Sequence, residues 1–220
     1  MIQIKLLLFN ELRVCCYVLW DETKEAILID PGCYSRSEQE RLKRFVVQEG
    51  LKPRCIVNTH AHFDHVMGNA FVCYQWRIKT YIHPAEQYTL ENTDRYCRLF
   101  NVEIEKPPVD TIPLQEQEPL CFGNSMLQVL ETPGHSPGGI CLYAPLDEFL
   151  ITGDTLFAGS IGRTDLPGGD FDLLMNSIQK KLFPLDASLR VLPGHGYETT
   201  LGYERLHNPF LIPNSGQFNL

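Results

Sequence analysis

Thr59-His60-Ala61-His62-Phe63-Asp64-His65 places three imidazoles and one carboxylate within seven residues. The stretch follows the apolar run 55–58, which predicts a short strand that ends at this point. In an extended loop, residues two apart project to the same side, so His60 and His62 can bind one metal ion. Asp64 and His65 then turn toward a second position.

Three later segments place a polar residue in the same context, directly after an apolar strand. They are Thr132-Pro133-Gly134-His135, Thr152-Gly153-Asp154-Thr155 and Pro193-Gly194-His195-Gly196. Three imidazoles can coordinate one ion, and two imidazoles with one carboxylate can coordinate another. A further carboxylate can be shared between the two ions. The residues therefore indicate a hydrolytic site for two metal ions. The mixed imidazole and carboxylate set suits zinc, iron or manganese.

Hydrophobic periodicity predicts two strand-rich halves, each with helices. Strands are expected at 2–9, 14–20, 26–29, 55–58 and 80–82, and again at 126–130, 140–143, 149–151 and 190–192. Ser35 and Glu38 predict a capping box for the first long helix, and Phe171, Leu174 and Ile178 mark the apolar face of a later one. We expect two sheets between helical layers.

The segment 91–123 is rich in Pro, Glu and Gln. We expect it to be a long connection with little regular structure, lying over the site as a lid or wall. The residues after Tyr197 predict a short helix and a Pro/Asn-rich tail.

Length and charge restrict the class of protein. The chain has 220 residues, for which we expect a single domain over 1–220, and its net charge of −8 provides no basic surface for nucleic acid. No segment approaches the ~20 apolar residues that span a bilayer, and we find no signal peptide, so we expect a cytoplasmic protein without membrane partners. The eight cysteines are dispersed in apolar runs without a Cys-x-x-Cys pair, which favours buried thiols over disulfides or a cysteine zinc site.

Residues 59–65 resemble the Thr-His-x-His-x-Asp-His signature of the metallo-β-lactamase superfamily, and His135, Asp154 and His195 match its remaining ligand positions. The resemblance implies an α/β fold, the αββα four-layer sandwich of two mixed β-sheets flanked by helices, with a dinuclear site at one edge of the sheets. It also implies which residues hold each ion. His60, His62 and His135 would bind the first ion, Asp64, His65 and His195 the second, and Asp154 would bridge them.

Within the superfamily, Gly153-Asp154-Thr155-Leu156-Phe157 is similar to the glyoxalase II motif. True β-lactamases of this fold generally have Cys or Ser in place of Asp154, so antibiotic hydrolysis is not the expected primary role. Arg163 and Asp165 stand where full-length glyoxalase II has a Lys and a Tyr that hold glutathione. Arg163 is either a fork for a substrate carboxylate or the partner of Asp165 or Asp170 in an ion pair within its loop.

The resemblance implies a dinuclear hydrolase of thioesters such as S-lactoylglutathione, in which a water bridging two divalent ions is the nucleophile. We expect zinc, with iron or manganese as alternatives, a catalytic as well as a metal-binding role for Asp64, and substrate binding by Arg163. The partner is then a small-molecule thioester. The alternatives are an iron-dependent persulfide dioxygenase, whose Gly-Arg-Thr-Asp core is also found at 162–165, a lactonase, and a metal-binding module without catalysis.

Overall fold

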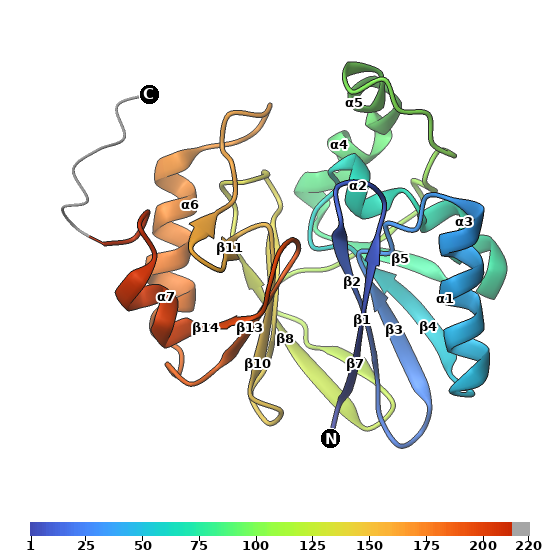
Figure 1. The fold of residues 1–220 in the computed structure, drawn as a ribbon, viewed down its shortest axis with the longest axis horizontal. Helices are drawn as coiled ribbons and strands as arrows, with labels where there is room; N and C mark the ends of the chain where they lie inside the picture. Colours follow the sequence, from blue (N-terminus) through green and yellow to red (C-terminus); the bar gives the residue numbers. More distant parts are fainter. Residues whose placement is uncertain (213–220) are drawn as a thin grey trace.

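The computed structural model describes residues 1–212, and the end of the expected tail, 213–220, lies outside the described residues. Two six-stranded sheets pack face to face, and helices cover the outer face of each (Figure 1). Helices α1 (Arg36–Gln48) and α3 (Asn69–Trp76) pack against the first sheet. Helices α6 (Phe171–Ser177) and α7 (Leu201–His207) pack against the second. The predicted αββα sandwich is confirmed.

The first sheet is mixed and has the order β1-β2-β3-β4-β5-β6. Its first three strands form an antiparallel meander, and β3, β4, β5 and β6 pair in parallel. The C-terminal ends of β1, β3 and β4 therefore lie at the same edge of the sheet. The strands are β1 (Gln3–Phe9), β2 (Val14–Trp20), β3 (Glu25–Ile29), β4 (Lys52–Val57), β5 (Lys79–Ile82) and β6 (Ile112–Pro113).

The second sheet has the order β14-β13-β10-β9-β8-β7. β10 and β13 are parallel, and β9 is antiparallel to both of its neighbours, β10 and β8. It follows that β8, β10 and β13 run in the same direction and end at the same edge. The strands are β7 (Leu120–Phe122), β8 (Ser125–Glu131), β9 (Ile140–Ala144), β10 (Phe149–Gly153), β13 (Arg190–Pro193) and β14 (Thr199–Thr200).

Smaller elements connect the sheets and helices. A short hairpin follows β10, and a π-helical turn continues α6. These elements are α2 (Phe63–Val66), the 3-10 turn Pro84–Glu86, α4 (Gln87–Glu91), α5 (Thr93–Leu99), β11 (Leu156–Phe157), β12 (Ser160–Ile161) and the π-helical turn Ile178–Leu182.

Strand β2 joins the two hydrophobic layers of the first half. Alternate side chains of a strand point to opposite faces. Tyr17 and Leu19 therefore pack between the sheets, whereas Val18 and Trp20 pack beneath the outer helices beside Leu42 of α1. Burial on both faces explains why the sequence of β2 is a continuous apolar run rather than an alternating one.

Helix α1 begins where the sequence predicts. Ser35 Oγ accepts a hydrogen bond from the Glu38 N–H at 3.3 Å, and Glu38 Oε2 accepts one from the Ser35 N–H at 2.9 Å. This capping box satisfies backbone donors that have no partner within the helix, which stabilises such a terminus by about 1 kcal/mol.

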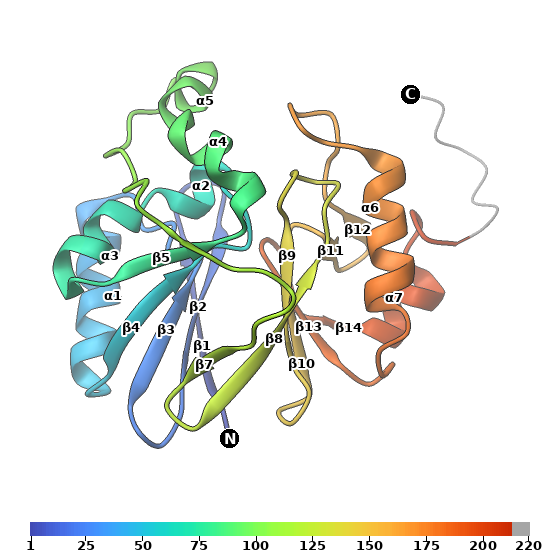
Figure 2. The same cartoon turned by 180° about the vertical axis from the view of Figure 1, so that it is seen from behind.

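Two expectations about regular structure were wrong. The segment 91–123 contains helix α5 and the short strands β6 and β7, and Figure 2 follows it from α5 past β5 to β7. Phe171, which we expected on a buried helical face, is 50% exposed. It is the first residue of α6, and the face packed against the second sheet begins with Leu174.

Within residues 1–212, no helix has both the length and the apolar character that crossing a membrane requires.

Candidate metal centre

The predicted ligands lie together at one edge of the two sheets. The loop after β4 and helix α2 supply four of them, and the loops after β8, β10 and β13 supply the rest. Because β8, β10 and β13 end at the same edge, residues up to 135 positions apart in the chain become neighbours. The structure brings together all seven, namely His60, His62, Asp64, His65, His135, Asp154 and His195.

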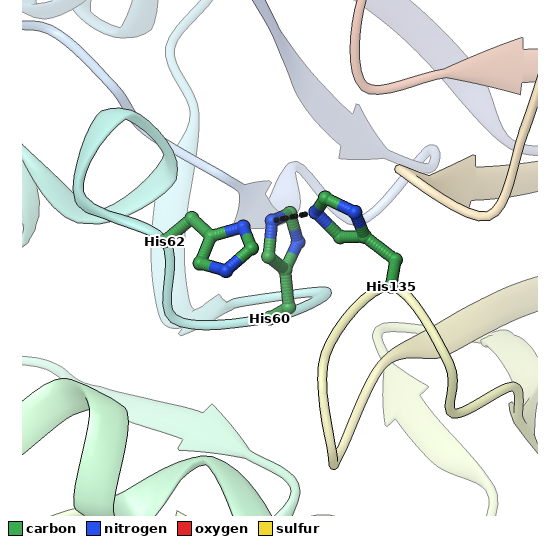
Figure 3. Close-up of side chains that lie close together, drawn as sticks. All are labelled: His60, His62 and His135. Atoms are coloured by element: carbon green, nitrogen blue, oxygen red, sulfur yellow. Dashed lines mark hydrogen bonds between the residues drawn. The ribbon is translucent and has the colours of Figure 1, made fainter. Parts of the chain in front are cut away.

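His60, His62 and His135 form the first group (Figure 3). Nε2 of His60 lies 3.3 Å from Nε2 of His135. The ring centroid of His62 is 4.7 Å from that of His60 and 4.6 Å from that of His135. One nitrogen from each ring lies within 4.8 Å of the other two, which allows the three imidazoles to share one ion.

Asp64, His65 and His195 form the second group. Nε2 of His195 lies 3.1 Å from Oδ2 of Asp64 and 3.3 Å from Nε2 of His65. Nε2 of His65 is 3.6 Å from the same Asp64 oxygen. The two groups are adjacent, since the His60 and His65 rings have centroids 4.1 Å apart.

Asp154 lies between the groups. Its Oδ1 is 3.4 Å from Nε2 of His65 in the second group, and its Oδ2 is 3.6 Å from Nε2 of His135 in the first. Oδ1 is buried and has no hydrogen-bond partner among the described residues. A carboxylate in this position can bind both ions, as the sequence predicts for the bridge.

Hydrogen bonds outside the cluster orient three of the imidazoles. Nδ1 of His135 donates to the carbonyl oxygen of Arg163 at 2.7 Å, and Nδ1 of His195 donates to that of Leu12 at 3.0 Å. Nδ1 of His65 donates to Oδ2 of Asp30 at 2.9 Å. Carbonyl and carboxylate oxygens only accept, so each neutral ring carries its hydrogen on Nδ1 and directs the Nε2 lone pair into the centre.

Burial and neighbouring charges shift the pKa values of the cluster in opposite directions. Burial and the neighbouring imidazoles lower the pKa of His62 to about 3 and hold the pKa of His60 well below its usual range. Burial opposes ionisation of Asp154, yet the charge of His65 lowers the pKa of that carboxyl. For His65, burial opposes protonation, but Asp64, Asp154 and Asp30 raise its pKa well above the usual value. His60 and His62 therefore offer neutral imidazoles, the form that binds metal.

The residues present fit two ions. Imidazole nitrogens and carboxylate oxygens converge within 3.1–3.7 Å, and a metal ion, like a proton, between them would offset the repulsion of their lone pairs. The buried Oδ1 of Asp154 also lacks a donor. Nitrogen and oxygen donors of this kind suit zinc, iron and manganese.

Asp30 is a further residue of the site that was not among the predicted ones. Asp30 is 1% exposed and follows β3, at the edge where β4 also ends. Its Oδ1 accepts the Thr59 N–H at 2.8 Å, and its Oδ2 accepts from the Thr59 hydroxyl at 2.6 Å and from His65. Asp30 therefore positions the ligand loop. The signal was available, since an acidic residue directly after an apolar strand was the pattern that identified Asp154.

Two glycines allow the close packing of these loops. Gly153 adopts φ +48°, a left-handed conformation that favours glycine. Gly194 is needed for space, because a Cβ there would lie 2.2 Å from Oδ1 of Asp154 and 2.9 Å from Cε1 of His65. A side chain at position 194 would occupy the centre itself.

A pocket of about 670 Å³ opens over the cluster. Tyr96, Phe100 and Val102 line it, so the segment 91–123 contributes a wall, as predicted. Arg163 also lines the pocket and is the one arginine or lysine among its described lining residues. Its Nε and Nη2 donate to the two carboxylate oxygens of Asp165, each at 2.7 Å. The ion pair considered for this loop is present, and the guanidinium nevertheless borders the pocket.

Other titratable groups lie outside the centre. His83 Nε2 lies 3.4 Å from Oε1 of Glu131, and the ring of His207 stacks on that of Tyr203. All eight cysteines are free thiols, and six of them are buried. Cys121 is exposed, contrary to the general expectation of burial.

Comparison with known proteins agrees with this geometry. The sequence profile of the metallo-beta-lactamase superfamily matches residues 10–195. The hydroxyacylglutathione hydrolase GloC of Haemophilus influenzae is 34% identical over 204 residues, which cover 91% of this chain and 93% of GloC.

Two crystal structures are similar over nearly the whole chain. BLEG-1 B3 metallo-beta-lactamase superposes with a TM-score of 0.88 at 38% identity, covering 96% of this chain and 100% of that one. TTHA1623 in a di-iron-bound form superposes with a TM-score of 0.85 at 39% identity, covering 94% and 100%. The chain therefore belongs to the metallo-β-lactamase superfamily, in its glyoxalase II-like branch.

Proposed function

We propose that this chain is a dinuclear metal-dependent hydrolase of small acyl thioesters. The observation that carries the proposal is the position of Asp154, whose two oxygens face two complete ligand groups beneath an open pocket. The name of GloC, a hydroxyacylglutathione hydrolase, supports the choice of thioester and makes S-lactoylglutathione the first substrate to test.

In this proposal, His60, His62 and His135 would hold one ion, Asp64, His65 and His195 would hold the other, and Asp154 would serve both groups. Ions held there would lower the pKa of a bound water toward neutrality and stabilise negative charge on the substrate's carbonyl oxygen. This chemistry requires no Ser or Cys nucleophile. Asp64 also lines the pocket, so we assign its carboxylate the catalytic task of orienting the attacking water.

The pocket supplies both apolar and charged contacts. Phe63, Met67, Phe100 and Val102 form an apolar wall suited to the hydrocarbon part of a thioester. The guanidinium of Arg163 is held by its bidentate pair with Asp165 at the border of the pocket, where it can also contact a substrate carboxylate. We therefore propose that Arg163 contributes to recognition of acidic substrates, and that the apolar wall binds the rest.

The two-group arrangement favours hydrolysis over persulfide oxidation. A single redox iron is typically held by two imidazoles and one carboxylate with open positions, and His60, His65 and Asp154 would suffice for it. The remaining ligands, among them Asp64 and His195, would then have no metal to bind. Because TTHA1623 was crystallised in a di-iron-bound form, iron remains a candidate metal for this site, together with zinc and manganese.

The test combines metal analysis with an activity screen. Protein purified without added metal is analysed for bound metals and then reconstituted with zinc, iron or manganese. Thiol release from S-lactoylglutathione, ring opening of a lactone and of a β-lactam, and oxygen uptake with glutathione persulfide are measured in parallel. We expect thiol release without oxygen uptake. Oxygen consumption with the persulfide and no thioester hydrolysis would contradict the proposal and establish the dioxygenase alternative.

A further inference from the structure

Asn10 lies at the tip of the β1–β2 hairpin, at the edge of the sheet that carries the ligands. Its backbone is left-handed, with φ +51°. Its Nδ2 donates to the carbonyl oxygens of Gly32 and Asp64, each at 3.1 Å, and its Oδ1 accepts the Leu12 N–H at 3.0 Å. The side-chain amide thus uses both donor hydrogens and its acceptor.

These contacts continue to a second ligand. The carbonyl oxygen of Leu12 accepts the hydrogen bond from Nδ1 of His195 at 3.0 Å. One side chain therefore connects the backbone of Asp64, through Leu12, to the imidazole of His195. Asp64 and His195 belong to the same ligand group, and their ligand atoms are 3.1 Å apart.

Glu86 occupies the equivalent position for the other group. It is fully buried, its Oε2 accepts the Ala61 N–H at 2.8 Å, and its Oε1 accepts the Gly138 N–H at 2.6 Å. Ala61 lies between His60 and His62, and Gly138 lies in the loop that carries His135. Glu86 connects the backbones of the two loops that supply the first group.

We infer that Asn10 and Glu86 are positioning residues, each of which sets the affinity of one ion site without contacting the ion. The inference rests on the two-ion site proposed above. Asn10 controls the site of Asp64, His65 and His195, and Glu86 controls the site of His60, His62 and His135. The chemistry of each side chain is specific, because an Asp at position 10 would direct a carboxylate oxygen at two carbonyl oxygens. A Gln at position 86 would direct an NH₂ group at a backbone N–H.

The test compares Asn10→Asp, Asn10→Gly and Glu86→Gln in the full chain. Gly accepts the left-handed conformation at position 10, so Asn10→Gly removes the side chain without backbone strain. Zinc affinity of each site is measured by chelator competition, and cobalt substitution reports which ligand group is occupied, since the visible spectrum depends on the donors. His195→Ala and His62→Ala provide reference spectra for loss of the second and the first site.

We expect a 10- to 100-fold loss of affinity at one site in each variant, the range typical of groups that orient metal ligands. The cobalt spectra of both Asn10 variants should match that of His195→Ala, and the spectrum of Glu86→Gln should match that of His62→Ala. Melting temperatures of the metal-free variants serve as the folding control and should remain close to that of the unmodified chain.

Equal weakening of both sites together with a lower melting temperature would reduce these residues to a general structural role and overturn the inference. Unchanged affinities would overturn it as well. Because no substrate enters the measurement, selective loss of one ion would stand even if the thioester screen failed. Binding of a single ion by the unmodified chain would instead contradict the dinuclear site on which both proposals rest.

Discussion

Oδ2 of Asp30 accepts a hydrogen bond from Nδ1 of His65 at 2.9 Å, and both side chains are almost completely buried. This contact assigns the Nδ1 hydrogen of His65 and leaves Nε2 as the metal-binding atom. It joins the end of β3 to helix α2 and explains why a residue outside the ligand set lies so close to the centre.

Asp30→Asn is expected to weaken metal binding by about 10- to 100-fold at the site of His65. An Asn amide has one acceptor oxygen, whereas both oxygens of Asp30 accept hydrogen bonds, so a donor of Thr59, Asn58 or His65 would face an NH₂ group. Chelator competition checks this prediction. Asp21→Asn, at a buried carboxylate that binds Thr23 and Ser125, is the matched control and should retain metal affinity. Equal affinities in the two variants would contradict the role of Asp30.

Asp154→Ala is expected to reduce the content of both ions, because Asp154 is the one proposed ligand shared by the two groups. The metal content of the purified variant, measured per chain, is the readout. Asp165→Ala, which removes a nearby exposed carboxylate, should retain two ions. Loss of one ion from the Asp154 variant would show that the bridge is assigned to the wrong residue.

Gly194→Ala is expected to abolish metal binding while the chain still folds. The added methyl group would lie 2.2 Å from Oδ1 of Asp154, well inside van der Waals contact, so that the carboxylate would have to move. Metal analysis combined with circular dichroism distinguishes this local effect from unfolding. Gly50→Ala is the control, because a Cβ at that position meets nothing within 4 Å. Its φ of +65° adds some backbone strain, but the variant should keep its metal. A Gly194→Ala protein with normal metal content would contradict the close approach seen here.

Substitutions of Arg163 and Asp165 should change the preference for acidic over neutral substrates in opposite directions. Arg163→Ala is expected to raise the KM for acidic thioesters about tenfold, because a hydrogen bond to a charged group is lost. Asp165→Asn should lower that KM, since it releases the guanidinium from its bidentate pair. Steady-state kinetics with acidic and neutral thioesters of the same length tests both variants. Equal changes on the two substrates, with a lower melting temperature, would remove Arg163 from the binding site.

The metal-free protein is expected to lose stability as the pH falls below about 6.5, the usual pKa of histidine. Burial lowers the pKa of His62 to about 3 and holds that of His60 well below its usual range, so as the pH falls below 6.5 the unfolded chain binds protons that the folded chain does not. The raised pKa values of His65 and His195 add stability below pH 6.5 and lose it at higher pH. Urea unfolding between pH 8 and pH 5 should therefore show maximum stability near pH 6.5.

His62→Gln separates these contributions. The variant should reduce the slope of unfolding free energy against pH below 6.5 by about one proton. The same slope in the His62 variant and the unmodified chain would show that burial of His62 does not oppose its protonation.

Much of the fold and all seven ligand positions follow from short-range patterns. The strands, the capping box at Ser35 and the histidines of 59–65 are each encoded in consecutive residues, and an apolar strand that runs into a polar loop is recognisable without knowledge of the rest. Helix α5 was missed because a seven-residue helix is marginal by itself. It is stabilised where Cys97 packs against Phe63 and Met67, about thirty residues earlier in the chain.

The sequence by itself determined the kinds of ligand and the ends of the strands that carry them, since these depend on neighbouring residues. Tertiary structure alone decided which oxygens and nitrogens face one another. The approach of Asp154 to His65 and His135 depends on the common direction of β8, β10 and β13 and on the packing of two sheets. The same holds for Asp30 and His65, which are 35 residues apart. Such contacts arise from the register and packing of whole strands, and no local stretch of the chain specifies them.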